Sequence, residues 1–200
     1  MSEEIEDEQG KLKNILDHTL HRLKNNLQTQ LSLINLQTIP SKSYFDEKKV
    51  IKDRFFALTY VYDLYYTSVK NQIQIEDPTL SLPTFLSKFS QYFKTSKSLI
   101  QIQFKNIADI NLNVDNLLLL SYIIVEINDF SKMLDEKINL EINQKHEKVF
   151  YKFSFLTLEN HENFRVLFKD QLKVFDLMVL QLKGKLDYKK KFVRLSFPIQ

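Results

Sequence analysis

The most informative stretch of this 200-residue chain is His21-Arg22-Leu23-Lys24-Asn25-Asn26-Leu27-Gln28. Its leucines continue a pattern that starts at Leu16 and Leu20 and reaches Ile34, in steps of three, four and seven residues, which predicts an amphipathic helix. His21 lies about 100° around that helix from Leu20, on the flank of the apolar stripe. The stretch therefore predicts a helix that presents a histidine beside two cations and two amides.

The composition favours a globular protein and excludes several function classes. Hydrophobic residues make up 44% of the chain and charged residues 26%, a balance that argues against wholesale disorder. The net charge of +3 is too small for a nucleic-acid-binding protein, and the lysines are dispersed. The absence of cysteine excludes a disulfide framework and a thiolate metal site.

The chain is expected to be cytoplasmic. Its N-terminus is acidic and lacks the apolar core of a signal peptide. The longest apolar run, Leu117–Val125, is far shorter than the roughly 20 residues that span a bilayer. A chain without cysteine also suits a reducing cytosol.

The first part of the chain is expected to hold an acidic tail, residues 1–10, and a helical hairpin, residues 11–74. Pro40 ends the first helix, and Ser41 and Ser43 are candidate N-caps for the second. The second helix carries a bundle seam with steps of four and three: Ile51, Phe55, Leu58, Tyr62, Tyr65 and Val69. A lone hairpin buries little surface, so we predict a homodimeric four-helix bundle. The alternative is that the hairpin packs against the second half of its own chain.

Residues 75–200 are expected to form an α+β sandwich, a sheet with helices on one face. The patterns predict strands at residues 79–82, 99–104, 138–142, 149–155, 186–188 and 192–197, and helices at 83–93, 114–133 and 168–182. The strands at 138–142 and 149–155 form an antiparallel pair, and Gly184 is expected to cap the last helix.

The neighbours of His21 suit the transfer of a phosphoryl group. Imidazole titrates at about pH 6.5, so a histidine offers a neutral nucleophilic nitrogen at cellular pH. Asp17, one turn earlier, would hold the proton of the other ring nitrogen. Lys24 and Asn25, one turn later, would contact phosphoryl oxygens, with Arg22 as a second cation. These five residues form the predicted catalytic site.

The alternative for any single histidine is that it is merely solvated on a polar helix face. We expect this of His18, His146 and His161, because no convergent group of residues surrounds them in the sequence. No metal-ligating set is predicted in this chain.

The order of residues around His21 resembles the dimerisation and phosphotransfer domain of bacterial sensor histidine kinases, in the subclass whose acceptor motif is H-R-x-K-N-N-L-Q. All eight positions match. Weaker similarities follow in the family's order at Leu31–Gln37, Arg54–Tyr65, Thr79–Phe93 and Leu180–Pro198. The resemblance implies that His21 is the phosphoacceptor and that the second half is a kinase-type ATPase fold. One departure is that His18 stands three residues before the acceptor, where the family commonly has an acid.

The residues with which such kinases hold ATP are largely missing. The family uses an N-E-L-x-x-N-A helix, and the equivalent segment here is Val125-Glu126-Ile127-Asn128-Asp129-Phe130-Ser131. Glu126 matches, but Val125 and Phe130 replace the two asparagines, and a phenylalanine cannot ligate Mg²⁺. The family's glycine-rich phosphate loops cannot be built, because the only glycines are Gly10 and Gly184. We therefore expect a degenerate ATPase-like domain with no cofactor of its own.

The resemblance then implies a histidine phosphotransferase that relays phosphoryl groups between the aspartates of response-regulator receivers through His21, without ATP. The receiver domains would be its partners and would supply Mg²⁺, and neither nucleic acid nor membrane is expected to bind. One alternative is a non-catalytic dimeric adaptor or pseudokinase that binds a receiver or a kinase. A further alternative is an active kinase with an unusual nucleotide pocket.

Overall fold

The computed structural model describes residues 10, 16, 19–28, 44–70, 79–95, 100–105, 107, 110–135, 137–146, 148–155, 173–189 and 192–198. The chain divides into two compact units, Met1–Ser43 and Tyr44–Gln200. Residues 19–28 of the first unit form a helix, which carries His21 and is called here the His21 helix. The turn expected between the two helices of the hairpin lies outside the described residues.

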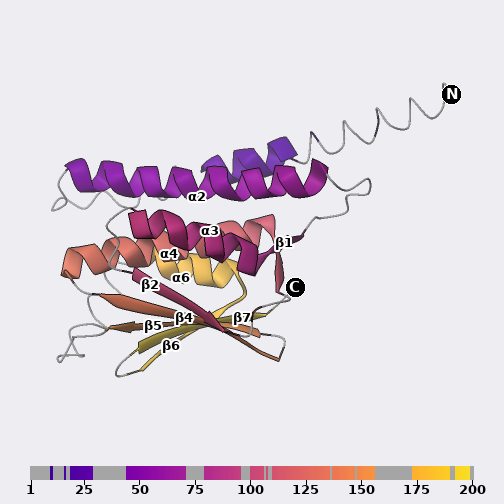
Figure 1. Ribbon diagram of the computed structural model, residues 1–200. Coiled ribbons are helices and arrows are strands. Elements are labelled where there is room, and N and C mark those ends of the chain that lie inside the picture. Colours follow the sequence, from indigo (N-terminus) through magenta and orange to yellow (C-terminus); the bar gives the residue numbers. More distant parts are fainter. Residues whose placement is uncertain are drawn as a thin grey trace. The chain divides into compact units, whose positions relative to one another are not determined.

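The second unit is built on a five-stranded sheet (Figure 1). Its strands, in spatial order, are β2 (Ile100–Lys105), β4 (Ile138–Lys145), β5 (Lys148–Phe155), β7 (Phe192–Pro198) and β6 (Lys185–Tyr188). The β2–β4 pair is parallel and the other pairs are antiparallel. Two further short strands, β1 (Thr79–Ser81) and β3 (Asn111–Asn113), pair with each other in a separate antiparallel sheet.

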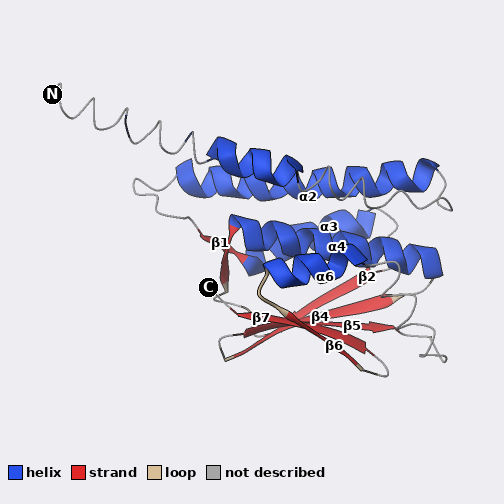
Figure 2. Cartoon of the chain, turned by 180° about the vertical axis from the view of Figure 1, so that it is seen from behind, coloured by secondary structure: helices blue, strands red, loops and turns tan. Residues whose placement is uncertain are grey.

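One face of the large sheet forms the core. Alternate residues of the three central strands are buried there, as a period of two requires: Ile138, Leu140, Ile142, Val149, Tyr151, Phe153, Val193, Leu195 and Phe197. The helices α3 (Leu82–Thr95), α4 (Val114–Leu134) and α6 (Lys173–Gln181) cover this face, as Figures 1 and 2 both show. The predicted α+β arrangement of a sheet with helices on one face is confirmed.

The long helix α2 (Tyr44–Lys70) lies on the side of α4 and α3 away from the sheet and packs mainly against α4. Among the α2 side chains whose burial the structure describes, residues 51–68, the buried ones are Asp53, Arg54, Ala57, Leu58, Val61 and Tyr65. This stripe only partly follows the predicted bundle seam, because Leu58 and Tyr65 are buried whereas Phe55 is 42% exposed. For α2, the structure therefore shows packing against the second half of the chain. The four-helix bundle of a dimer stays a prediction.

Helix α4 is apolar on nearly all sides because it is covered twice. The sheet lies beneath it and α2 lies above it, and Asp115 is the exposed residue in its first turn. The helix begins after Asn113, whose side chain accepts a hydrogen bond from the backbone N–H of Asn116 at 2.8 Å. No helix in the described ranges combines the length and hydropathy needed to cross a membrane.

The end of α6 differs from the prediction that Gly184 is its cap. The residue with positive φ is Lys183, at 51°. The N–H of Lys183 donates to the carbonyl of Leu180 at 2.9 Å, and that of Gly184 donates to the carbonyl of Val179 at 2.8 Å, which is the Schellman pattern. A Cβ at position 184 would lie 3.1 Å from the carbonyl oxygens of Val179 and Ser196, so a larger residue there would require these backbone atoms to shift by a few tenths of an ångström.

Candidate functional site

The His21 helix presents its histidine to solvent. His21 and Asn25 are both exposed, and their positions four residues apart place them one above the other on the helix surface. The Nδ2 atom of Asn25 lies 3.2 Å from Nδ1 of His21. Asn25 therefore engages one of the two ring nitrogens, and Nε2 is the ring nitrogen that this contact leaves open.

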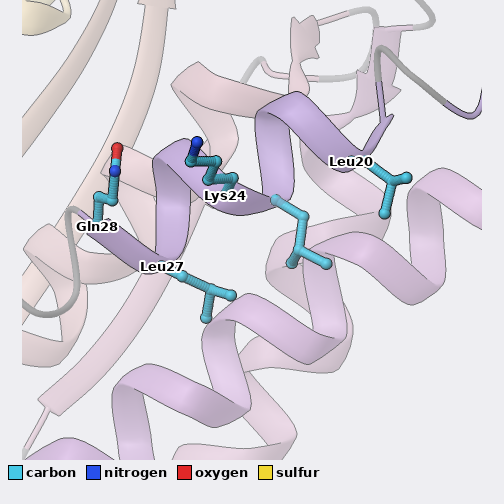
Figure 3. A pocket seen from close by; sticks show the side chains of 5 residues that line it. Leu20, Lys24, Leu27 and Gln28 are labelled. Atoms are coloured by element: carbon cyan, nitrogen blue, oxygen red, sulfur yellow. The ribbon is translucent and has the colours of Figure 1, made fainter.

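The two sides of the His21 helix differ in character. Figure 3 shows Leu20 and Leu27 projecting from one side, and Lys24 and Gln28 from the other. These four residues and Leu23 line an open hollow. Leu20 and Leu27 are 52% and 43% exposed, so the apolar stripe predicted from the sequence retains uncovered surface. A stripe of this kind suits packing against another apolar surface.

The structure brings some of the predicted site residues together and leaves others undetermined. The contact between His21 and Asn25 is present, although we predicted Asn25 as a ligand of phosphoryl oxygens rather than of the ring. Lys24 is exposed one turn from His21, and Arg22 is half-buried. Asp17 lies outside the described residues, so its orienting role stays a prediction.

A second polar site, between α2 and α4, was not foreseen. Arg54 is fully buried, and its Nε donates to Oε1 of Glu126 at 2.8 Å. Nη2 of Arg54 donates to the same oxygen, and Glu126 is 4% exposed. Both residues lie in segments that resemble the kinase family, but the sequence gives no signal that they pair across 72 positions.

A neighbouring cluster joins α2 to α3 as well. The hydroxyl of Tyr92 donates to Oδ1 of Asp53 at 2.6 Å, and Nζ of Lys132 lies 3.9 Å from Oδ2 of Asp53. The ring of Tyr92 stacks on Phe56, with centroids 3.6 Å apart. Burial, together with the hydrogen bond to Asp53 and its charge, raises the pKa of Tyr92. Burial also raises the pKa of Tyr60 to about 12, with a contribution from the charge of Asp63.

The residues of α4 do not fit a magnesium-bound nucleotide of the kind that the family resemblance implies. Val125 and Phe130, which stand at the two asparagine positions, are 1% and 3% exposed and belong to the core. The carboxylate of Glu126 is held by Arg54. In the part of the chain that the structure describes, no three His, Cys, Asp or Glu side chains gather in a group that could hold a metal ion.

Comparison with known proteins identifies the fold. No protein-family model and no curated protein matches the sequence. Among solved structures, the blue-light activated histidine kinase of Erythrobacter litoralis EL346 is similar, with a TM-score of 0.63 and 14% identity over 92% of this chain and 62% of that one. The histidine kinase domain of the same protein matches over 92% of this chain and 94% of its own length, with a TM-score of 0.58 and 10% identity. This chain thus spans only 62% of the length of the larger kinase chain. These likenesses show that the chain has the fold of a histidine kinase domain.

Proposed function

We propose that this protein is a histidine phosphotransferase that relays phosphoryl groups between the aspartates of response-regulator receivers through His21, without using ATP. The observation that carries the proposal is an exposed histidine, with Asn25 on its ring and Lys24 one turn away, in a chain with the fold of a histidine kinase domain. The homodimer is part of the proposal, because the His21 helix has an apolar stripe that is still partly uncovered.

The transfer needs only a nucleophile, correct positioning and compensation of charge. A ring nitrogen of His21 would form a bond to phosphorus while the bond from phosphorus to the receiver aspartate breaks, and the carboxylate leaves with the electron pair. Charge spreads over the phosphoryl oxygens during such a transfer, so the cations of Lys24 and Arg22 would stabilise it. The acidic pocket of the receiver would supply Mg²⁺, and the phosphotransferase itself would need no metal.

Three features support a reaction without ATP. Val125 and Phe130 are core residues where kinases of the family have asparagines. Glu126, the one position that matches, forms an ion pair with Arg54. The sequence has no glycine between Gly10 and Gly184, so it lacks the glycines that let backbone amides approach phosphates closely.

The test is incubation with receiver domains that carry ³²P on their aspartate. We expect acid-labile label on the wild-type protein and none on the His21→Ala variant. The matched control is His146→Asn, which alters an exposed histidine and keeps a residue that tolerates the positive φ of 55° at that position. This control should be labelled like the wild type.

Three results would contradict the proposal. Label on His21→Ala would place the acceptor elsewhere. Label transferred from γ-³²P-ATP to the wild-type protein would show a kinase. The lack of label from every receiver, together with tight binding of one of them, would show a non-catalytic adaptor.

A further inference from the structure

The contact between His21 and Asn25 has chemical consequences beyond holding the ring in place. The carboxamide of Asn25 has a donor, Nδ2–H₂, and an acceptor, Oδ1, which exchange places when the amide turns by half a revolution. Neutral imidazole likewise has one protonated and one unprotonated nitrogen, and the partner of one nitrogen decides which is which. At 3.2 Å, the side chain of Asn25 is within hydrogen-bonding distance of Nδ1 in either orientation of the amide.

The two orientations select opposite tautomers of His21. When Nδ2–H donates to Nδ1, the ring proton must be on Nε2, and Nε2 then has no lone pair for attack. When Oδ1 accepts from Nδ1–H, the proton is on Nδ1 and the lone pair of Nε2 is free. The second arrangement is the nucleophilic one, because it frees the nitrogen that Asn25 does not touch.

We propose that Asn25 is a positioning residue that sets the tautomer of His21, with its amide oxygen on Nδ1–H in the reactive state. This inference rests on the proposed phosphotransfer. Nε2 would form the bond to phosphorus, the phosphorus–oxygen bond of the receiver aspartate would break, and the carboxylate would take the electron pair. Nδ1 keeps its proton on the oxygen of Asn25 throughout, so the phosphorylated ring is an imidazolium whose positive charge offsets part of the phosphoryl charge. The step therefore needs no proton acceptor.

Protonation of the His21 ring also requires the amide oxygen of Asn25 to face Nδ1. Imidazolium carries hydrogen on both nitrogens, so only the oxygen of Asn25 can face it. A carboxylate at position 25 would favour both the Nδ1–H tautomer and the imidazolium, because it can only accept and is negatively charged. Asn25→Asp is therefore the variant that preserves the required acceptor, and Asn25→Leu is the near-isosteric variant that removes it.

The experiment measures the ring ¹⁵N chemical shifts of His21 across pH in the full-length, unphosphorylated protein without any receiver. Relative to the wild type, Asn25→Asp should raise the Nδ1–H population and move the titration of His21 to higher pH. Asn25→Leu should change the tautomer ratio by about twofold, the scale of an exposed contact between residues four apart on a helix. Gln28→Leu, which alters another exposed amide on the same helix, should change neither quantity.

Transfer from a ³²P-labelled receiver provides the second readout. Asn25→Asp should retain transfer with a pH profile displaced upward, whereas Asn25→Leu should lower the rate at saturating receiver. Unchanged tautomer ratios in both Asn25 variants would overturn the inference even if His21 is labelled. Changed ratios with no label on His21 would instead overturn the proposed phosphotransfer and leave the control of the tautomer established.

Discussion

Arg54 of α2 and Glu126 of α4 form an ion pair that is almost completely shielded from water, with exposed fractions of 0% and 4%. The Nε–Oε1 distance is 2.8 Å, and two guanidinium nitrogens converge on the same carboxylate oxygen. Desolvating two charges costs about as much as their attraction returns, so such a pair is a weak source of stability. We expect its main effect to be on the rotation and register of α2 on α4, because an arrangement that separated these two buried side chains would leave each charge unpaired.

Replacing only one partner of this pair should lower the free energy of unfolding far more than replacing both. Arg54→Met and Glu126→Leu each leave one buried charge unpaired, and each should lower the free energy of unfolding by about 3–5 kcal/mol. The double variant should recover most of that loss. Urea unfolding followed by circular dichroism checks this, and single variants that unfold at the wild-type urea concentration would contradict it.

The hydrogen bond from Tyr92 to Asp53 should stabilise the fold in a pH-dependent way. Below about pH 10, Tyr92→Phe should be less stable by about 1.5–3 kcal/mol, because Asp53 loses a donor within 2.6 Å. The raised pKa of Tyr92 means that the fold favours the neutral phenol, a contribution that is complete below the unfolded pKa and declines above it. The difference between the two proteins should therefore shrink as the pH rises above about 10.

Urea unfolding at a series of pH values measures this effect. The matched control is Tyr66→Phe, because Tyr66 lies on the same helix as Asp53 and is 65% exposed. It should unfold like the wild type at every pH below 10. A constant difference between Tyr92→Phe and the wild type up to pH 12 would contradict the proposed linkage.

Two adjacent residues at the end of α6 should respond to substitution in opposite directions. Lys183 has a φ of 51°, a conformation that glycine adopts without strain, so Lys183→Gly should stabilise the protein by about 1 kcal/mol. Gly184→Ala should destabilise it, because the new Cβ would approach two backbone carbonyl oxygens to 3.1 Å. Thermal unfolding monitors both variants, and shifts of the same sign would show that this helix end is wrongly described.

The exposed leucines of the His21 helix test the predicted dimer. The wild-type protein should have twice the chain mass of 23.9 kDa in light scattering, and Leu27→Lys should give monomers or aggregates, because it places a charge in the apolar stripe. Leu177→Lys on α6 is the control, since Leu177 is 54% exposed but lies outside the predicted seam. An intact dimer of Leu27→Lys would show that the seam is misassigned.

The regular elements of the second unit were predictable because their patterns are local. Alternation alone placed β4, β5 and β7, and the apolar run after Asn113 gave the whole of α4. The short strand β3 was not predicted, because it pairs with β1, a segment far from it in the sequence, and the residues around it give no local strand pattern. The parallel pairing of β2 with β4 also has no local signal.

The candidate site was predictable in its residues but not in its contacts. The acceptor motif identified His21 and Asn25, whereas the ring nitrogen that Asn25 engages depends on side-chain rotamers. The pairing of Arg54 with Glu126 was beyond sequence reasoning, because the charge pattern of α2 does not reveal which helix covers Arg54. Apolar residues spaced alternately four and three positions apart show that one face of a helix is apolar. The spacing does not tell which other element packs against that face.

The packing of α4 between the sheet and α2 has a consequence for how the second unit unfolds. The sheet packs on one side of α4 and α2 on the other, and most of the helix's described side chains are buried. We therefore expect water to reach its central amides only after both neighbours have separated. Amide hydrogens near the middle of α4 should therefore exchange with deuterium only through global unfolding of the second unit. The protection factor of α4 would thus report the full stability of that unit.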